Sequence, residues 1–261
     1  MLHSSVKPVS LTTLLRRKKK SGDKEIPENY ASDSFRPTQI EVGNMADKKG
    51  SAYVEFGSTK VICAIDGPKE VTKTSDAEYM DCKICVFYRN TSSSAIATAS
   101  NTSNKQNSTI RSAIESTLRS MVCLDLFCKA QIDVEITVIE DDGGVLAVAL
   151  IASCLALVDS GIQLYDVCVA AHIVMLADGR VIVDPPNSLL LPSSGSDSKD
   201  LLKNAHLSVT VGIMPSLNQL TCCDFVGIAT PVQLKRAIAA AVENSIKLYP
   251  LIRKTLENRA A

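Results

Sequence analysis

The residues best placed to do chemistry lie in the segment Val138–Ala147, where an apolar run ends in three acidic residues and two glycines before a second apolar run begins. This pattern predicts a strand, a tight glycine turn and the start of a helix. Such a turn directs backbone N–H groups and the positive end of a helix dipole at one point, which suits a phosphate group. An enzyme that uses phosphate would place Ser, Thr or Arg directly after the glycines, but Val145 and Leu146 stand there. The segment therefore predicts the backbone frame of an anion site without the side chains that would complete it.

Two other groups of residues have the types that bind metal ions. The carboxylates of Glu140–Asp142 are adjacent at a strand end, so they do not converge on one ion, and their charge would repel a phosphate. Cys82 and Cys85 form a C-x-x-C pair, but a zinc site needs a second pair of ligands, and Cys222-Cys223 does not have that spacing. We therefore expect structural cysteines, no metal site and no cofactor.

The composition of the chain sets limits on its class. It has 261 residues, of which 46% are apolar, so it can bury a large core. Lys plus Arg and Asp plus Glu both number 28, whereas a protein that binds nucleic acid through its overall charge would be basic. Nine Cys without a signal peptide favour free thiols in a reducing compartment. We also expect no transmembrane segment, because every long apolar stretch is interrupted by polar residues.

The domain organisation follows from shifts in composition. Residues 1–35 are polar and contain the basic run Arg16–Lys20, so we expect a disordered basic tail. The run could be a nuclear-import signal, a nucleic-acid-contacting arm or a solvated segment. The ordered domain is expected over residues 36–258, in two similar halves, 36–160 and 161–258. Residues 91–108, rich in Ser, Thr and Asn, are expected to form a mobile loop in the first half.

The elements that must position the glycine turn are mostly strands. Alternating apolar residues and turn signals predict strands over 38–42, 51–56, 60–66, 79–88, 132–139, 167–176, 180–183, 207–213 and 217–221. Gly57-Ser58 is expected to connect the second strand to the third, and Gly67-Pro68 to end the third. Ala177-Asp178-Gly179 predicts a hairpin.

Three helices are expected among these strands. Apolar residues recur at helical spacing from Ile110 to Met121, and residues 145–158 form an uncharged, Ala-rich run typical of a buried helix. Thr230-Pro231 should open the last helix, which Pro250 should kink or interrupt. The order ββββ–α–β–α–ββββ–α predicts an α+β fold with mixed sheets and packed helices rather than a doubly wound parallel sheet.

The chain resembles the RNase PH family in several motifs that occur in the family's order and spacing. They are Gly50–Val61 followed by Gly67-Pro68, the turn Asp142–Gly144, the segment Ala156–Ile162 and the pair Val183-Asp184. The resemblance covers residues 36–258 and implies an RNase PH-like fold, of the kind called ribosomal protein S5 domain 2-like.

Within that family the chain is most similar to ring subunits of the eukaryotic RNA exosome. The segments that carry this likeness are 140–144, 161–166, 207–219 and 246–250. The resemblance implies a six-membered ring of RNase PH-like subunits with RNA passing through its centre. It also implies cap proteins with S1 or KH domains, an associated exoribonuclease, no membrane partner, and a location in the nucleus, the nucleolus and also the cytoplasm.

Active members of the family cleave RNA from its 3′ end with phosphate as the nucleophile. That reaction needs cations to hold the phosphate and an acid to protonate the leaving oxygen. The resemblance places Leu146 where the family has a phosphate-binding Arg, two residues after the Gly143-Gly144 pair, and His206 where it has a catalytic Asp. Loss of the guanidinium removes a charge-assisted contact of about 1.5–3 kcal/mol. An imidazole can still act as a general acid.

Three cations remain as candidates for contact with RNA. The family has a basic pair at the start of its first helix, of which this chain keeps only Lys105, in a polar segment read as part of the loop. Arg111 and Arg119 are eight residues apart on the predicted helix and could share one face. That face could contact RNA, face another subunit or be solvated.

These substitutions predict a non-catalytic ring subunit of the RNA exosome core. It would scaffold the complex and help guide rRNA, mRNA and nuclear RNA for 3′-to-5′ processing and degradation. One alternative is an active phosphate-dependent exoribonuclease of the RNase PH type, with His206 as the acid and Lys105 as the phosphate cation. Another is a free-standing RNA-binding module, which the neutral charge and the scarcity of aromatic residues disfavour.

Overall fold

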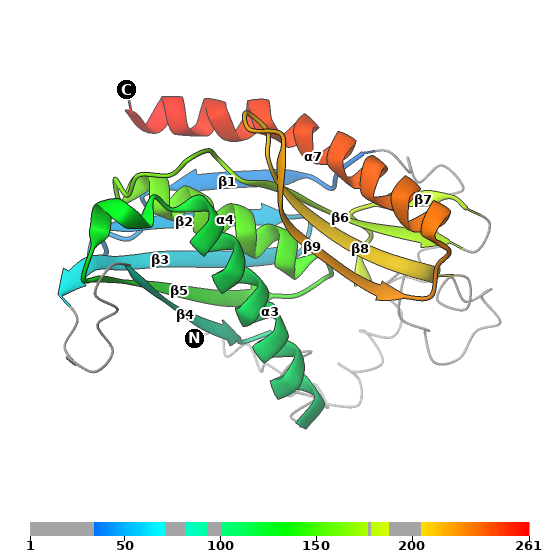
Figure 1. Cartoon of the computed structure of the whole chain (residues 1–261), viewed down its shortest axis with the longest axis horizontal. Helices are drawn as coiled ribbons and strands as arrows, with labels where there is room; N and C mark the ends of the chain where they lie inside the picture. The colour runs from blue at the N-terminus through cyan, green and yellow to red at the C-terminus, as the bar shows by residue number, and fades with distance from the viewer. Residues whose placement is uncertain (1–33, 71–81, 93–100, 177–178, 188–204, 261) are drawn as a thin grey trace, which may run out of the picture. The chain divides into compact units, whose positions relative to one another are not determined.

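The computed structural model describes residues 34–70, 82–92, 101–176, 179–187 and 205–260 (Figure 1). They belong to one compact unit that spans Ser32–Ala261. The predicted tail 1–35, with its basic run Arg16–Lys20, therefore lies outside the described residues except for Ser34 and Phe35.

The first half of the domain contains a five-stranded sheet in the order β1-β2-β3-β5-β4. Its strands are β1 Thr38–Val42, β2 Gly50–Phe56, β3 Thr59–Glu70, β4 Lys83–Asn90 and β5 Ala130–Glu140. All neighbours are antiparallel except β4 and β5, which are parallel, so the sheet is mixed. The side-chain period of two buries alternate residues of β2, among them Ala52, Val54 and Phe56.

The second half contains an antiparallel four-stranded sheet in the order β7-β6-β8-β9. Its strands are β6 Val169–Leu176, β7 Val181–Val183, β8 Ala205–Met214 and β9 Gln219–Gly227. The turn between β6 and β7 includes residues 177–178, which lie outside the described residues, but the hairpin predicted around them is confirmed by the pairing of Ile173 with Val183.

Helices cover these sheets and join their cores (Figure 1). They are α3 Asn101–Met121, the short 3-10 helix η2 Leu124–Phe127, α4 Val145–Asp159 and α7 Pro231–Ala260. The helix α4 is apolar on all sides and packs against strands of both sheets, so nearly all of its residues are buried. The helix α7 packs against β6 and β8. No helix in the described part of the chain is long and apolar enough to cross a membrane.

The α+β class and the order of elements are confirmed, but the expected loop over residues 91–108 is wrong in its second half. Residues 93–100 lie outside the described residues, and α3 begins at Asn101 rather than near Ile110. The polar residues on which the loop prediction rested include Ser108, which lies with Thr109 and Ser112 on an exposed side of α3. The buried residues Ile114 and Leu118 hold the helix against the core, so tertiary packing outweighs the low helix propensity of Ser, Thr and Asn.

The prediction that Gly67-Pro68 ends the third strand is also wrong. β3 continues to Glu70, because a shift in its register against β5 between Asp66 and Lys69 accommodates the dipeptide. Glycine is required at position 67, since a Cβ atom there would lie 2.8 Å from the carbonyl oxygen of Gln131.

The last helix is not interrupted at Pro250. A proline removes one backbone hydrogen bond from a helix, but α7 continues to Ala260. Leu248 and Ile252, on either side of the proline, are both buried against the body of the protein, and this packing maintains the helix.

Several strand boundaries differ from those predicted. The fourth strand begins at Lys83 rather than at Tyr79, and residues 79–81 lie outside the described residues. The ninth is β9, which runs from Gln219 to Gly227 rather than over 217–221. β8 begins at Ala205 rather than at Leu207, and residues 188–204 before it lie outside the described residues. The division into halves 36–160 and 161–258 stays a prediction.

Candidate functional site

The glycine turn has the geometry that the sequence predicts. β5 ends at Glu140 and α4 begins at Val145. Gly143 has a φ angle of 98° and Gly144, the N-cap residue, has a φ angle of 69°, a region that strongly favours glycine. No side chain caps the helix, so its first N–H groups are of the kind that can face an anion.

A buried arginine holds this turn in place. Arg36 donates from Nε to Asp184 Oδ2 at 2.8 Å and from one terminal nitrogen to Asp184 Oδ1 at 2.7 Å, a bidentate pair. The same guanidinium donates to the backbone oxygens of Asp142 at 3.0 Å and Gly143 at 3.1 Å. Arg36 therefore ties the start of the described chain to both the glycine turn and the residue that follows β7.

Two more polar residues complete this network. The Thr59 hydroxyl donates to the Gly143 carbonyl oxygen at 2.8 Å and accepts from the Asp142 N–H at 3.1 Å. The Asn187 N–H donates to the Asp142 carbonyl oxygen at 2.9 Å. Residues from the segment before β1, the start of β3 and the segment after β7 thus bind one turn, which leaves its backbone little freedom to adapt to a ligand.

The charges around the turn favour cations rather than phosphate. Asp141, Asp142 and Asp184 all belong to the hydrogen-bonded network, whereas Arg36 is the cation within it. At the end of β5, Lys60 pairs with Glu140 at 3.3 Å, so its charge is matched by a further carboxylate. Among the described residues at the turn, carboxylates therefore outnumber cations.

His172 adds no positive charge at neutral pH. Burial lowers the pKa of its imidazole to about 4, outweighing Asp184, which favours the charged form. Its Nδ1 lies 2.9 Å from the Thr210 hydroxyl oxygen, and its carbonyl oxygen accepts from the Asp184 N–H at 2.8 Å. His172 lies beside Gly144, so a neutral ring borders the start of α4.

The two residues that follow the glycine pair belong to the apolar core. Val145 is 7% exposed and Leu146 is 6% exposed, and both lie in the cluster of buried residues that joins the two sheets. The first turn of α4 therefore serves packing at the positions where a phosphate-binding enzyme would carry polar side chains.

The other predicted site residues are not brought together by any described contact. Lys105 lies in the first turns of α3 and His206 lies in β8 rather than before it; their side chains are outside the described residues. Arg111 and Arg119 are exposed on α3, and Arg119 lies 3.9 Å from Glu115 in an ion pair within the helix. Their predicted contact with RNA stays a prediction.

Sequence reasoning did not identify Arg36 and Asp184 as partners. Both carried a signal, because Phe35-Arg36-Pro37 marks the start of the ordered chain and Val183-Asp184 is one of the family-like motifs. Their separation of 148 residues is the reason that the pairing could not be read from spacing.

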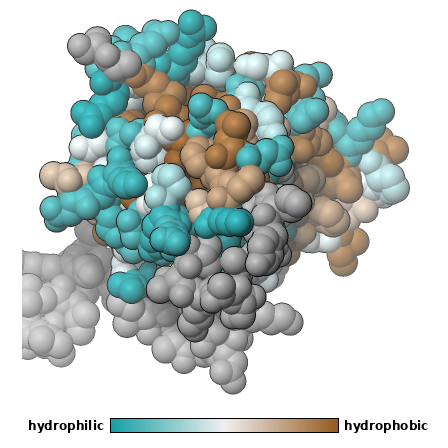
Figure 2. Space-filling model, turned by 60° about the vertical axis from the view of Figure 1, so that its left-hand side comes forward, coloured by the Kyte–Doolittle hydropathy of each residue, from teal (hydrophilic) through white to brown (hydrophobic). Residues whose placement is uncertain are grey.

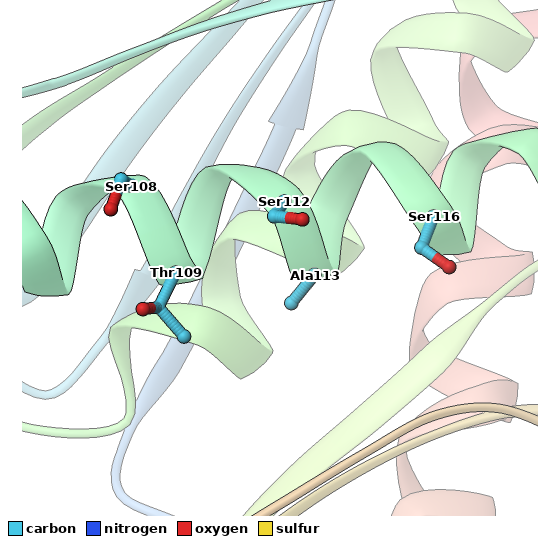
Figure 3. A pocket seen from close by; sticks show the side chains of 5 residues that line it. All are labelled: Ser108, Thr109, Ser112, Ala113 and Ser116. Atoms are coloured by element: carbon cyan, nitrogen blue, oxygen red, sulfur yellow. The ribbon is translucent and has the colours of Figure 1, made fainter.

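One further hollow lies on the surface of α3, as Figure 3 shows. Its lining consists of Ser108, Thr109, Ser112, Ala113 and Ser116. The hydroxyl groups can form hydrogen bonds, but the lining includes no cation to bind a phosphate and no residue of the glycine turn.

Comparison with known proteins places these observations in a family. The model of the 3′ exoribonuclease family, domain 1, called RNase PH, matches residues 34–163. The mouse protein "Exosome complex component MTR3" is 28% identical over 253 residues, which cover 91% of this chain and 88% of that protein. "Exosome complex component Rrp41" of the archaeon Nitrosopumilus maritimus is 28% identical over 227 residues, which cover 87% of this chain and 88% of that protein.

Solved structures show the same fold. Rice Rrp46 superposes with a TM-score of 0.72 and 22% sequence identity, over 87% of this chain and 98% of that one. A chain of an archaeal exosome core superposes with a TM-score of 0.67 and 15% identity, over 93% of this chain and 95% of that one. At these identities the likeness is one of fold, and it confirms the RNase PH-like architecture expected from the motifs.

Proposed function

Because this chain carries an RNase PH domain and so belongs to the RNase PH family, we propose that it is a non-catalytic ring subunit of an RNA exosome core. Its homology to exosome components supports the assembly, and the glycine turn supports the loss of catalysis. The observation that carries the proposal is the network in which Arg36 neutralises Asp184 within the protein while Leu146 is buried. The turn keeps its backbone frame, but its charges and its first helical side chains serve folding.

The proposed role is to scaffold the ring and to help guide RNA toward a separate exoribonuclease for processing and degradation. Its partners would be other RNase PH-like subunits, cap proteins with S1 or KH domains, and RNA. We propose the nucleus, nucleolus and cytoplasm as the places where it acts. The surface of the molecule supports assembly, because Figure 2 shows hydrophobic atoms gathered in patches between hydrophilic ones on the face it displays.

The test is a decay assay with the purified assembly. A 3′-labelled single-stranded RNA is incubated with inorganic phosphate and with the ring that contains this chain, and release of nucleoside diphosphates is measured. We expect the variants Lys105→Ala and His206→Ala in this chain to leave any phosphate-dependent decay unchanged. A loss of decay in the His206→Ala ring, with the ring intact by size-exclusion chromatography, would contradict the proposal.

The same assay decides the alternative of an active phosphate-dependent exoribonuclease. One observation favours that alternative: the strand–turn–helix frame and the uncapped start of α4 are those of an anion site. In that case His206 would protonate the leaving oxygen and Lys105 would hold the phosphate. Substitution of either residue would then abolish phosphate-dependent release of nucleoside diphosphates.

A further inference from the structure

The outer edge of β9 is free in the described part of the chain. β9 is the last strand of the second sheet and pairs with β8 along its inner edge, while no described strand pairs with its other side. An edge strand presents a row of backbone N–H and C=O groups that another strand can pair with. In Figure 1, β9 lies at the outer side of β8, away from β6.

Large apolar side chains are exposed on both faces of this edge. Phe225 lies opposite Val209 and is 54% exposed, whereas Val226 lies opposite Ser208 and is 69% exposed. Successive residues of a strand point to opposite faces of the sheet, so these two side chains flank the edge above and below. A partner lying on one face would cover only one of them, but a strand added to the edge brings side chains to both.

The apolar surface continues into the start of the last helix. Ile228 is 85% exposed and Val232 is 78% exposed. Together with Phe225 and Val226 they form what we call the β9 edge surface. Four large apolar residues this close in sequence and this exposed are typical of a surface that a partner buries.

The β9 edge also lacks the features by which proteins protect a free edge. Such edges commonly carry lysine or proline, which disfavour pairing with another strand. β4, at the edge of the first sheet, has Lys83 and Arg89, whereas β9 has neither lysine nor proline and has Asp224 as its charged residue. The other two edge strands, β1 and β7, also lack lysine and proline, but neither has an exposed large apolar side chain, whereas β9 has Phe225 and Val226. This combination indicates that β9 is paired in the assembled protein.

We propose that a β-strand of another RNase PH-like subunit pairs with the outer edge of β9 and covers the β9 edge surface. This inference rests on the proposed function, which supplies subunits of that kind. A second copy of this chain fits less well. Antiparallel pairing of β9 with itself around Cys223 places the two Asp224 residues diagonally across the pair, where like charges repel.

A photocrosslinking experiment tests the proposal on the full chain in its own cells. Benzoylphenylalanine replaces Val226 in one tagged version and Leu126 in the control, because Leu126 is 61% exposed but lies in η2, outside any strand. After irradiation, the covalent products are purified and identified by mass spectrometry. We expect position 226 to give a product with an RNase PH-like subunit at least tenfold more efficiently than position 126. A product with a second copy of this chain, with an unrelated protein, or with none overturns the proposal.

A matched pair of substitutions separates this inference from the proposed function. We expect Val226→Lys to reduce recovery of at least one RNase PH-like subunit at least tenfold in affinity purification, and Leu126→Lys to leave it unchanged. Equal recovery with both variants overturns the β9 inference and leaves the proposed function standing. If the unsubstituted chain recovers no RNase PH-like subunit, the proposed function fails as well. Thermal unfolding of each purified variant checks its fold, and if Val226→Lys does not fold, the crosslink decides.

Discussion

Arg36 illustrates what a single residue contributes to this protein. Its guanidinium is 6% exposed and meets the Asp184 carboxylate, which is 2% exposed, in a bidentate pair. A buried pair of this kind adds little net stability over apolar residues, but removal of one partner leaves an uncompensated buried charge. The main effect of losing one partner would therefore be an unpaired buried charge next to the glycine turn.

We accordingly expect Arg36→Met to lower the free energy of unfolding by about 3–5 kcal/mol, since Asp184 would remain buried without its cation. Urea unfolding at pH 7 measures the change. The control is Arg253→Met, which removes an arginine that pairs with Glu257 on the solvent side of α7 and should leave the unfolding midpoint unchanged. The double substitution Arg36→Met with Asp184→Asn should recover part of the loss. A loss no greater than that of the control would show that the network is dispensable.

His172 gives the protein a predictable response to acid. Its pKa is lowered to about 4 in the folded state by burial, against about 6.5 in an unfolded chain. The unfolded chain therefore binds a proton first as pH falls, so the stability contributed by the neutral ring is complete above pH 6.5 and is lost between 6.5 and 4. The size of this contribution is about 2–4 kcal/mol. Asp184 and Arg36, which also face the ring, act on its pKa in opposite directions.

The measurement is urea unfolding of the parent protein and of His172→Gln at pH 7, 5.5 and 4.5. Glutamine can still bind the Thr210 hydroxyl but does not titrate, so carboxylate effects common to both proteins cancel in the comparison. We expect the parent protein to lose stability more steeply than His172→Gln over this range. Parallel curves would mean that the ring is already protonated or is accessible to solvent.

Among the elements, the two ends of α4 need glycine for different reasons. Gly143 has a positive φ angle, and a Cβ atom at that position would lie 2.8 Å from the Pro185 carbonyl oxygen. Gly161, just after α4, has a φ angle of 76°, but a Cβ atom there would have no neighbour within 4 Å, so only its backbone conformation requires glycine. The two residues therefore separate the steric requirement from the conformational one.

We expect Gly161→Ala to cost about 1 kcal/mol, the usual penalty for a left-handed non-glycine residue. Gly143→Ala should cost about 2–4 kcal/mol, because two penalties add: the backbone strain and a clash with the Pro185 carbonyl oxygen. The hydrogen-bonded network holds the segment with Pro185 against the turn. Thermal and urea unfolding of the two variants provide the comparison. Equal losses would indicate that the segment after β7 moves away from the turn without cost.

At the scale of the whole molecule, the balance of charge determines how the isolated chain meets RNA. The formal net charge is zero at pH 7, and the described turn carries more carboxylates than cations. Affinity for a polyanion comes largely from release of counterions by clustered Lys and Arg. A single neutral subunit has little of this driving force, whereas a ring can combine local cations from several subunits.

We therefore expect the isolated chain to bind a single-stranded RNA oligonucleotide weakly at physiological salt. The logarithm of its binding constant should change with the logarithm of salt concentration with a slope of about −2 or shallower, since few phosphates are neutralised. Fluorescence anisotropy over a salt series measures the slope, and the assembled ring is the comparison. Tight binding by the chain alone with a steep slope would support a free-standing RNA-binding module.

The α+β class, the order of the elements and the place of the glycine turn could all be predicted from the sequence. These follow from local properties, because strand and helix periodicity and the conformational freedom of Gly143 and Gly144 act over a few residues. The same local reasoning failed at the start of α3, where packing of buried residues outweighs intrinsic preference. Two features could be seen only in the folded protein: the contact of Arg36 with Asp184, and the outer edge of β9, which is free in the described part of the chain. Both features depend on which distant segments the two sheets bring together. A hydrogen bond between such segments, or the exposure of a strand edge, is set only when the chain folds.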